Sequence, residues 1–365
     1  MKGWIDNCQH RHQLCMEMPQ QVGRPKRLLQ CLSDDSVRLV ETTQRCDYIA
    51  LSYCWGDGKA VLKTTEKTTE EAISTLDRHQ SGIPDKDLPP LYQEVVALAR
   101  GLNIRYLWID SLCIVHDSPE DKSEEISKMS DIFRGALVVV VAATAKSPLD
   151  SLLRVKPQDQ SHIWRTASLV SYQEMDLDVK FRKRYGRRPH DGRRPHDHRD
   201  ATSSTPIARR AWCFQEKLLA SRCLVFCEDE VVWECRSCCL CECSGEQEHF
   251  SEQAARFRTM KRYQQIYFAD AEAAYSFWET AVENYSDRAL SFETDRLPAI
   301  SAVASIVAEA TGDRYLAGLW RNDLLAGLAW IIVLNLAAQT PRPNYIAPTW
   351  SWASMSPRVE YYEHW

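Results

Sequence analysis

The chain has no long apolar run and only a small excess of negative charge. Its first residues, MKGWIDNCQHRHQLC, contain no apolar stretch, so we expect no signal peptide. The most apolar segment, 324–338, is shorter than the roughly 18 residues of a membrane span, and it contains Asn335. A net charge of -5 gives no overall attraction to nucleic acid or to an anionic membrane. We therefore expect a cytoplasmic protein without nucleic-acid or membrane partners.

Signatures of two common enzyme classes are missing. There is no Gly-x-Ser-x-Gly motif, which carries the nucleophile of many serine hydrolases, and none of the 10 histidines is placed by its spacing beside a nucleophile. A nucleotide-binding P-loop is absent as well. A Ser/His/Asp or Cys/His hydrolase and a P-loop nucleotide hydrolase are therefore poor explanations of this sequence.

Cysteine, by contrast, is abundant, with 14 residues scattered over 365 positions. Without a secretory context we expect reduced thiols rather than disulfides. The motif Cys8-x3-His12-x2-Cys15 has ligand types and spacing compatible with zinc, but it supplies three ligands. A dense cysteine group at 235–243 includes the pair Cys235-x2-Cys238. Two interpretations remain open: a structural zinc site that this group completes, or a set of reduced, partly buried thiols.

Three short apolar runs alternate with helical patterns in the first half of the chain. The runs Tyr48–Tyr53, Tyr106–Val115 and Leu137–Ala143 predict buried strands. Helices are predicted between them, over 88–103 and 118–134. This order predicts an α/β fold with a parallel sheet and helices on both faces. In such sheets, ligands bind at the carboxyl ends of the strands.

Candidate ligand-binding residues follow two of these strands. The first strand runs into a loop that contains Ser52, Tyr53, Trp55 and Gly56, and Asp110 follows the apolar start of the second. The glycine would let the backbone approach a phosphate group. The alternatives are simple packing for the loop residues and a capping role for Asp110.

Composition divides the chain into three parts. Residues 1–47 form an N-terminal preamble with two predicted short strands, 48–245 hold the α/β pattern, and 246–365 are predicted to be mainly helical and rich in Trp. Residues 155–207 interrupt the α/β part with a basic tract that repeats RRPHD at 187–191 and 193–197. We predict a mobile surface insertion there, with a nucleic-acid or metal-binding tract as the alternative.

Two further carboxylates are candidate site residues on predicted helices. The segment AWCFQEKLL at 211–219 carries Trp212 and, one helical turn on, Glu216. Glu216 is either a group of a catalytic site or an exposed helix residue paired with Arg209 or Arg210. Glu125, in the helix predicted over 118–134, is either a second site carboxylate or a partner of the positive helix end.

Together these motifs resemble the fungal heterokaryon-incompatibility (HET) domain family. The segments YIALSYCWG at 48–56, YLWIDSLCI at 106–114, EISKMSDIFRGA at 125–136 and RAWCFQEKL at 210–218 look like its four signatures. Later segments, such as DRLPA at 295–299 and WSWAS at 350–354, resemble the C-terminal half of many relatives. His116 stands where the family usually has Gln. The resemblance implies a role in self/non-self recognition and programmed cell death, with other incompatibility or signalling proteins as partners.

The order of elements is also similar to that of a TIR domain, which has a flavodoxin-like sheet. Trp212, Cys213 and Glu216 match its Trp-Cys-x-x-Glu helix, although the following leucine is displaced by one position and the insertion before the helix is longer. In enzymatic TIR domains this glutamate catalyses NAD hydrolysis, and such domains act as oligomers. The resemblance therefore implies NAD as substrate and self-association. We expect Glu216 and Asp110 to be catalytic, with a ligand-binding set of Ser52, Tyr53, Trp55, Gly56, Trp212 and Glu125 around them.

Three functions remain open at this point. The chain is an effector that binds or cleaves NAD, a non-catalytic interaction module, or a scaffold recruited as a biosynthetic enzyme. An ordered site formed by Glu216, Asp110 and Ser52 favours an enzyme. A Glu216 that points into solvent away from them favours the interaction module.

Overall fold

The computed structural model describes most of the chain. The described residues are 1–16, 23–33, 35–67, 74–152, 205–227, 231–241, 268–333, 345–355 and 357–362, with the short segments 165–166, 180–181, 245–246 and 259–261. The predicted basic tract with its RRPHD repeat, at 182–199, lies outside them. The predicted domain boundaries at 47/48 and 245/246 stay predictions.

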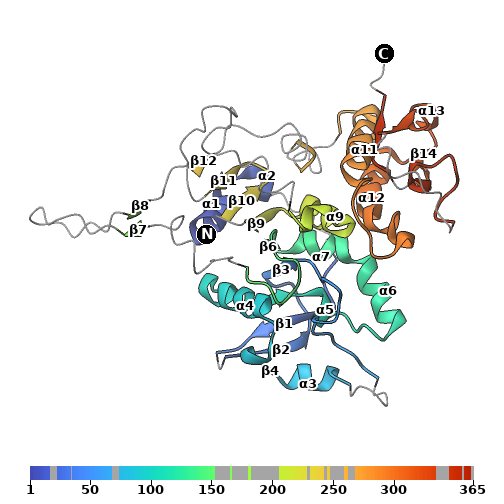
Figure 1. Cartoon of the computed structure of the whole chain (residues 1–365). Helices are drawn as coiled ribbons and strands as arrows, with labels where there is room; N and C mark the ends of the chain where they lie inside the picture. Colours follow the sequence, from blue (N-terminus) through green and yellow to red (C-terminus); the bar gives the residue numbers. More distant parts are fainter. Residues whose placement is uncertain are drawn as a thin grey trace, which may run out of the picture.

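Four parallel strands form the centre of one large sheet (Figure 1). They lie in the order β5 (Tyr106–Trp108), β3 (Tyr48–Ser52), β6 (Val138–Ala142) and β9 (Arg222–Phe226). Every residue of β3, β6 and β9 is buried, which explains the near-continuous apolar runs in the sequence. Counted along the chain, this is the 2-1-3-4 strand order of flavodoxin-like sheets. The predicted α/β class is confirmed.

Antiparallel strands extend this centre on both sides, so the sheet is mixed rather than wholly parallel. Beyond β5 lie β1 (Arg27–Cys31), β2 (Ser36–Glu41) and β4 (Ile83–Pro84), and beyond β9 lie β10 (Val231–Cys235), β11 (Cys239–Cys241) and β12 (Gly245–Glu246). The N-terminal preamble thus supplies an edge of the main sheet. Adjacent strands joined by short turns pair antiparallel, which gives β1–β2 and β9–β10 their direction.

Helices cover both faces of the parallel centre. In Figure 1, α4 (Pro90–Leu102) lies on one side of β3 and β6, and α7 (Met129–Gly135) and α9 (Ala211–Leu219) lie on the other. Right-handed crossovers require this arrangement, because the chain runs from β3 to β5 in one direction and back to β6 in the other. The apolar face of α4 is buried, with Pro90 in its first turn and Asn103 ending it in the left-handed conformation.

Two predicted elements differ from the structure. The strand expected over 106–115 ends at Trp108, and a one-turn helix, α5 (Asp110–Cys113), follows it. Asp110 favours the turn because its Oδ1 accepts the amide of Ser111 at 2.7 Å. The helix expected over 118–134 is divided at Lys128 into α6 (Pro119–Ser127) and α7.

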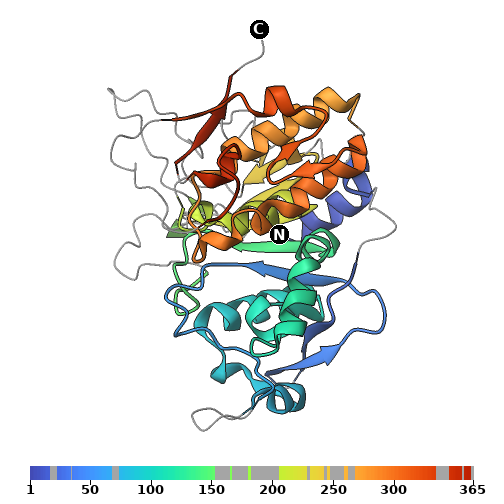
Figure 2. The same ribbon diagram turned by 90° about the vertical axis from the view of Figure 1, so that its right-hand side faces the viewer.

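The C-terminal region packs against α9 and is mainly helical, as predicted (Figure 2). Its elements are α11 (Ala271–Tyr285), α12 (Ser301–Thr311) and α13 (Leu324–Gly327), with the strand pairs β13 (Tyr315–Leu316)–β14 (Leu319–Trp320) and β15 (Trp330–Ile332)–β16 (Val359–Tyr361). Ala211, Phe214 and Leu218 of α9 belong to this second core. The opposite face of α9 therefore meets the sheet while this face anchors the C-terminal region.

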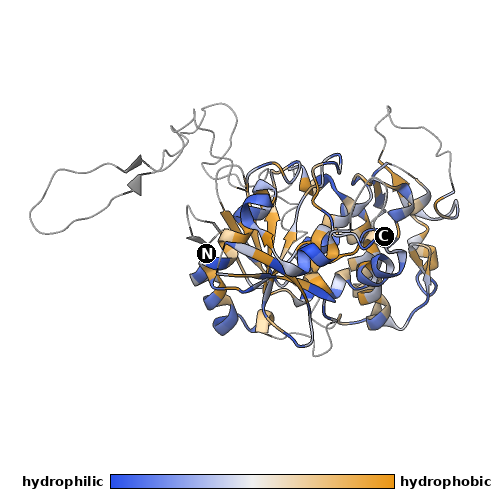
Figure 3. Ribbon diagram, turned by 90° about the horizontal axis from the view of Figure 1, so that it is seen from below, coloured by the Kyte–Doolittle hydropathy of each residue, from blue (hydrophilic) through white to orange (hydrophobic). Residues whose placement is uncertain are grey.

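The remaining elements are short or lie at the surface. They are α1 (Lys2–Arg11), α2 (Gln13–Met16), α3 (Leu76–Ser81), β7 (Arg165–Thr166), β8 (Lys180–Phe181) and single 3-10 turns such as η2 (Ile207–Arg209) and η4 (Pro298–Ile300). Figure 3 shows apolar residues gathered on the central strands and hydrophilic residues on the outer helices. In the described part of the chain, none of the helices combines the length and apolar character needed to cross a bilayer.

Candidate active site

The loops after β3 and β6 meet at the carboxyl edge of the sheet. The chain leaves β3 and β6 on opposite sides of the sheet order, and such a switch point is where α/β sheets place ligands. Gly56, with φ +66°, lies so close to the second loop that an added Cβ would be 2.9 Å from Ser147 Cβ. Two loops that touch above neighbouring strands form a defined floor for a site.

Glu216 lies at this edge and faces β3. The Oγ of Ser52, the last residue of β3, donates to Glu216 Oε2 at 2.5 Å, and the glutamate is 7% exposed. Burial raises the pKa of Glu216 to about 7, and the negative charge of Asp110 adds to the rise, whereas Ser52 and Arg210 oppose it. The carboxyl group is therefore poised between its two protonation states near neutral pH. The structure excludes the exposed, solvent-facing Glu216.

Asp110 joins the same edge from the end of β5. Its Oδ2 accepts the indole Nε1 of Trp55 at 2.8 Å, and its carbonyl lies 3.3 Å from His116 Nε2. Burial raises the pKa of Asp110, although contacts with Tyr53 and Trp55 oppose the rise. The Trp55 ring stands edge-on to His116, with centroids 5.4 Å apart, and Lys63 Nζ lies 5.1 Å from its centroid. The predicted Trp55 and Asp110 thus form one cluster.

Hydrogen bonds fix the strand ends that carry these groups. The Tyr53 hydroxyl lies 2.6 Å from that of Tyr92, which lies 2.9 Å from Ser111 Oγ. Arg210 Nη1 donates to the Tyr53 carbonyl at 2.9 Å. Tyr92 and Ser111 were not among the predicted site residues, and Arg210 was considered as a direct partner of Glu216. Ser111 follows a candidate carboxylate, but Tyr92 has no distinguishing pattern, because it lies on the buried face of α4.

Two predicted ligand-binding residues lie apart from this cluster. The indole of Trp212 donates to Asp295 Oδ2 in the C-terminal region at 3.2 Å. Glu125 is buried beside the amide of Lys26, with its Oε2 at 3.3 Å, and near Lys128 Nζ at 3.6 Å. Glu125 therefore contacts the residue before β1 and the residue that ends α6, and it lies apart from Glu216.

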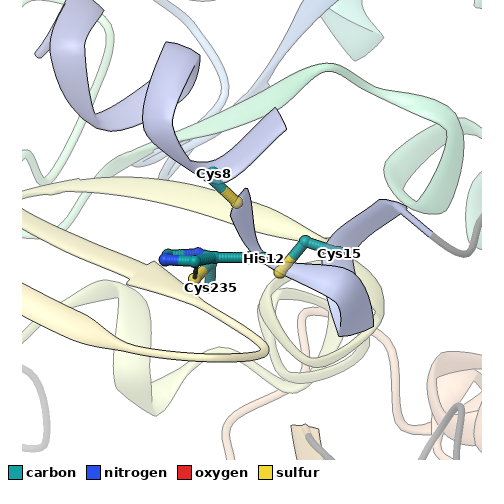
Figure 4. A group of neighbouring side chains, drawn as sticks. All are labelled: Cys8, His12, Cys15 and Cys235. Atoms are coloured by element: carbon teal, nitrogen blue, oxygen red, sulfur yellow. Dashed lines mark hydrogen bonds between the residues drawn. The ribbon is translucent and has the colours of Figure 1, made fainter. Parts of the chain in front are cut away.

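The predicted metal ligands converge elsewhere, at the other end of the sheet. Cys8, His12, Cys15 and Cys235 each offer a ligand atom, and these four atoms lie within 4.8 Å of one another (Figure 4). Cys238 stands beside them, with its Sγ 3.6 Å from that of Cys235. The spacing motif in the N-terminal preamble and the later cysteine group thus meet in space.

A cavity of about 300 Å³ lies at the amino ends of β5 and β6. Its lining includes Ile5 and Asp6 of α1, together with Asp47, Arg105 and Tyr106. The lining holds none of the candidate site residues. This cavity is therefore separate from the carboxyl-edge cluster that holds Glu216.

The close contact between the two loops at Gly56 predicts a larger loss of stability there than at Gly58 when each glycine is replaced by alanine. Gly56→Ala is expected to lower the free energy of unfolding by about 2 kcal/mol, because it adds steric contact with Ser147 to the strain of a positive φ. Gly58→Ala, at φ +78° with open space around its Cβ, is the matched control and should cost about 1 kcal/mol. Chemical denaturation measures both. Equal losses would contradict the close approach.

Comparison with known proteins identifies the domain that carries this site. Residues 48–216 match the family model of the heterokaryon incompatibility protein (HET). The match begins at the first residue of β3 and ends at Glu216, so it spans the whole carboxyl-edge cluster. No curated protein and no solved structure matches the chain.

The chain therefore contains a domain of the heterokaryon-incompatibility family. This assigns it a heterokaryon-incompatibility-type role in general terms.

Proposed function

We propose that the chain is an effector enzyme that hydrolyses the nicotinamide–ribose bond of NAD. The observation that carries this proposal is Glu216, a buried carboxyl group at the switch point of the sheet, hydrogen-bonded by Ser52 and with a pKa of about 7. In a cytoplasmic setting, NAD depletion would trigger the cell death that the family resemblance implies. The likeness of the Trp212-to-Glu216 motif to a TIR domain supports the same chemistry.

The main catalytic requirement of this reaction is stabilisation of the positive charge that develops on the ribose. Nicotinamide leaves the ribose with the electron pair of the broken bond and becomes neutral, so it needs no acid. Positive charge then develops on the ribose, and a water molecule bonds to C1′ and loses its proton to solvent. An ionised Glu216 stabilises this charge in a site that excludes most water. Ser52 orients the carboxylate, and Asp110 contributes a second negative charge.

Nicotinamide release from NAD tests the proposal. We expect the purified chain, at concentrations that allow self-association, to release nicotinamide, and Glu216→Gln to lower kcat at least about 100-fold. Glutamine keeps an acceptor for Ser52, so the loss reports the charge and not the packing. Glu125→Gln neutralises a carboxyl group that is just as buried but lies apart from the site, and it should retain activity. Wild-type chain without turnover at any concentration would refute the hydrolase.

The pH dependence of this activity depends on the same carboxyl group. Because Glu216 acts as a carboxylate and its pKa is about 7, kcat/KM should rise about tenfold per pH unit below 7 and level off above it. A profile that is flat from pH 5 to 8 would remove Glu216 from the rate-limiting chemistry. Steady-state rates in buffers of constant ionic strength provide the measurement.

A second candidate is an interaction module that self-associates, and exposed apolar side chains in the C-terminal region favour it. Leu325 is 89% exposed, and Leu328, Ile331, Trp350 and Tyr362 are also exposed. Large apolar groups that remain in water favour association. Light scattering should show a mass that grows with concentration, and Leu325→Asp should reduce it. A monomer at all concentrations would argue against this candidate.

A further inference from the structure

We propose that Cys8, His12, Cys15 and Cys235 bind one structural zinc ion that fastens the N-terminal helices to the edge of the sheet. The ligands come from three segments: Cys8 from α1, His12 and Cys15 from the turn and helix α2, and Cys235 from the end of β10. In Figure 4 their side chains converge on a common centre. This inference is independent of the NAD proposal, because it concerns different residues at a different edge of the sheet.

The distances fit a tetrahedral zinc site. Zn–S bonds of about 2.3 Å and Zn–N bonds of about 2.0 Å imply sulfur–sulfur separations of about 3.8 Å and sulfur–nitrogen separations of about 3.5 Å. His12 Nδ1 lies 3.4 Å from Cys235 Sγ, and all four ligand atoms lie within 4.8 Å of one another. Three thiolates and one imidazole form a closed set of four ligands, which is typical of structural rather than catalytic zinc.

The backbone after β10 supports Cys235 as a thiolate ligand. The Cys238 amide donates to Cys235 Sγ at 3.3 Å, and the Cys235 amide donates to the Cys238 carbonyl at 2.9 Å. Amide donors to ligand sulfurs stabilise thiolates and orient them toward a metal. Cys238 itself lies outside the set of four. Its Sγ is 4.0 Å from His12 Nε2, whereas Cys235 Sγ lies 3.4 Å from His12 Nδ1.

A buried arginine beside the cluster favours negative charge there. Arg222 is 6% exposed, and its Nε donates to Cys8 Sγ at 3.2 Å while its Nη2 donates to the Cys15 carbonyl at 2.9 Å. Within the described residues, no carboxylate forms an ion pair with Arg222. A buried guanidinium needs a compensating negative charge. Three thiolates with one Zn²⁺ carry a net charge of -1 and so place negative charge beside this guanidinium, whereas three neutral thiols supply none.

The site would hold a segment that has few other attachments. The helices α1 and α2 have 10 and 4 residues, and their buried residues are Ile5, Cys8 and Cys15. Trp4 adds a ring contact with Trp233 of β10, with centroids 6.4 Å apart. Short helices with so small an apolar face are marginal by themselves. Two of the three buried residues of this segment are proposed ligands, so metal binding and docking of the segment are coupled.

Metal content and cysteine accessibility of the full chain test the site. We expect about one zinc per chain after purification with reductant, as a closed ligand set requires. Cobalt exchanged for zinc should give the visible absorption of a tetrahedral ion with thiolate charge-transfer bands. Chelation should expose Cys8, Cys15 and Cys235 to alkylation, whereas Cys113, a buried thiol outside the cluster, should stay protected in both states. This second measurement needs no variant to fold.

Variants assign the ligands. Cys8→Ser and Cys235→Ser should lose the metal, and Cys113→Ala should retain it. His12→Cys should retain cobalt with a stronger thiolate charge-transfer band, because it converts the site to four sulfurs. The proposal is overturned if the reduced chain binds neither zinc nor cobalt supplied in excess. Loss of metal in Cys238→Ser together with full retention in His12→Ala would overturn the assignment of His12.

Discussion

Asp121→Asn is expected to lower the free energy of unfolding by about 3 kcal/mol, because it removes one partner of a buried ion pair and leaves the other. Asp121 of α6 is 7% exposed and accepts from Arg27 Nη2, from Lys26 Nζ at 2.9 Å and from the Val115 amide at 2.9 Å. Arg27 is 4% exposed, and it would keep its charge with the Cys113 carbonyl as a remaining acceptor. The ion pair joins β1 to α6, the second helix after β5.

The pKa of Asp121 supports this magnitude. Burial acts to raise this pKa, but hydrogen bonds from Arg27 and Lys26 outweigh burial and lower the pKa to about 2 from 3.8. The carboxylate thus contributes stability that is present above pH 3.8 and is lost as the pH falls through 2. A pKa difference of nearly 2 corresponds to about 2 kcal/mol. The uncompensated charge of Arg27 in the variant adds to this loss.

Chemical denaturation at pH 7 provides the measurement, and the chain offers a matched control. Glu120 lies next to Asp121 in the first turn of α6 but is exposed, so Glu120→Gln should change the free energy of unfolding by less than about 0.5 kcal/mol. The double variant Asp121→Asn/Arg27→Met, which removes both charges, should recover part of the loss. If Asp121→Asn behaves like Glu120→Gln, the pair is not a stabilising contact.

The central strands could be predicted because burial on both faces leaves a direct mark on the sequence. VVVVA at 138–142 is apolar at every position, and β6 is buried at every position. The amphipathic pattern of α4 and its terminal residues were equally informative. The helix α5 could not be predicted from LWIDSLCIV, because its apolar residues are buried in either conformation. A local hydrogen bond at Asp110 decides the conformation there.

The site could be predicted only as far as the strand order determines it. Ser52 and Asp110 end parallel strands, and the edge at which such strands end is known before the structure is. The contact between Glu216 and Ser52 depends on how α9 packs across β3. The two residues are 164 positions apart, so no local sequence pattern predicts this contact. Trp212 shares the motif with Glu216, but the C-terminal region binds its indole. The spacing motif of Cys8, His12 and Cys15 likewise predicted three of the proposed ligands and could not establish the fourth.

Glu216 is expected to lower the free energy of unfolding of the wild-type chain by about 3 kcal/mol between pH 4 and pH 8, and Glu216→Gln is expected to abolish this fall. Burial raises the pKa of Glu216 from 4.5 to about 7. Between these two values the folded chain keeps a proton that the unfolded chain has released, so folding is favoured at low pH. This contribution is fully present below pH 4.5 and is lost as the pH rises through 7. A pKa difference of about 2.5, at about 1.36 kcal/mol per pH unit, gives the expected size.

Unfolding free energies of the wild type and of Glu216→Gln, measured in parallel from pH 4 to pH 8, test this expectation, because titrating groups that do not interact with Glu216 cancel in the difference. Ser52→Ala is the complementary variant, because it removes a hydrogen-bond donor that favours the carboxylate. It should raise the pKa of Glu216 further, so its stability should fall more between pH 4 and pH 8 than that of the wild type. A constant difference between wild type and Glu216→Gln would mean that the carboxyl group titrates as if exposed. The expected result would join stability to the proposed function, since a carboxylate that destabilises the fold at neutral pH is the kind of group that catalytic sites contain.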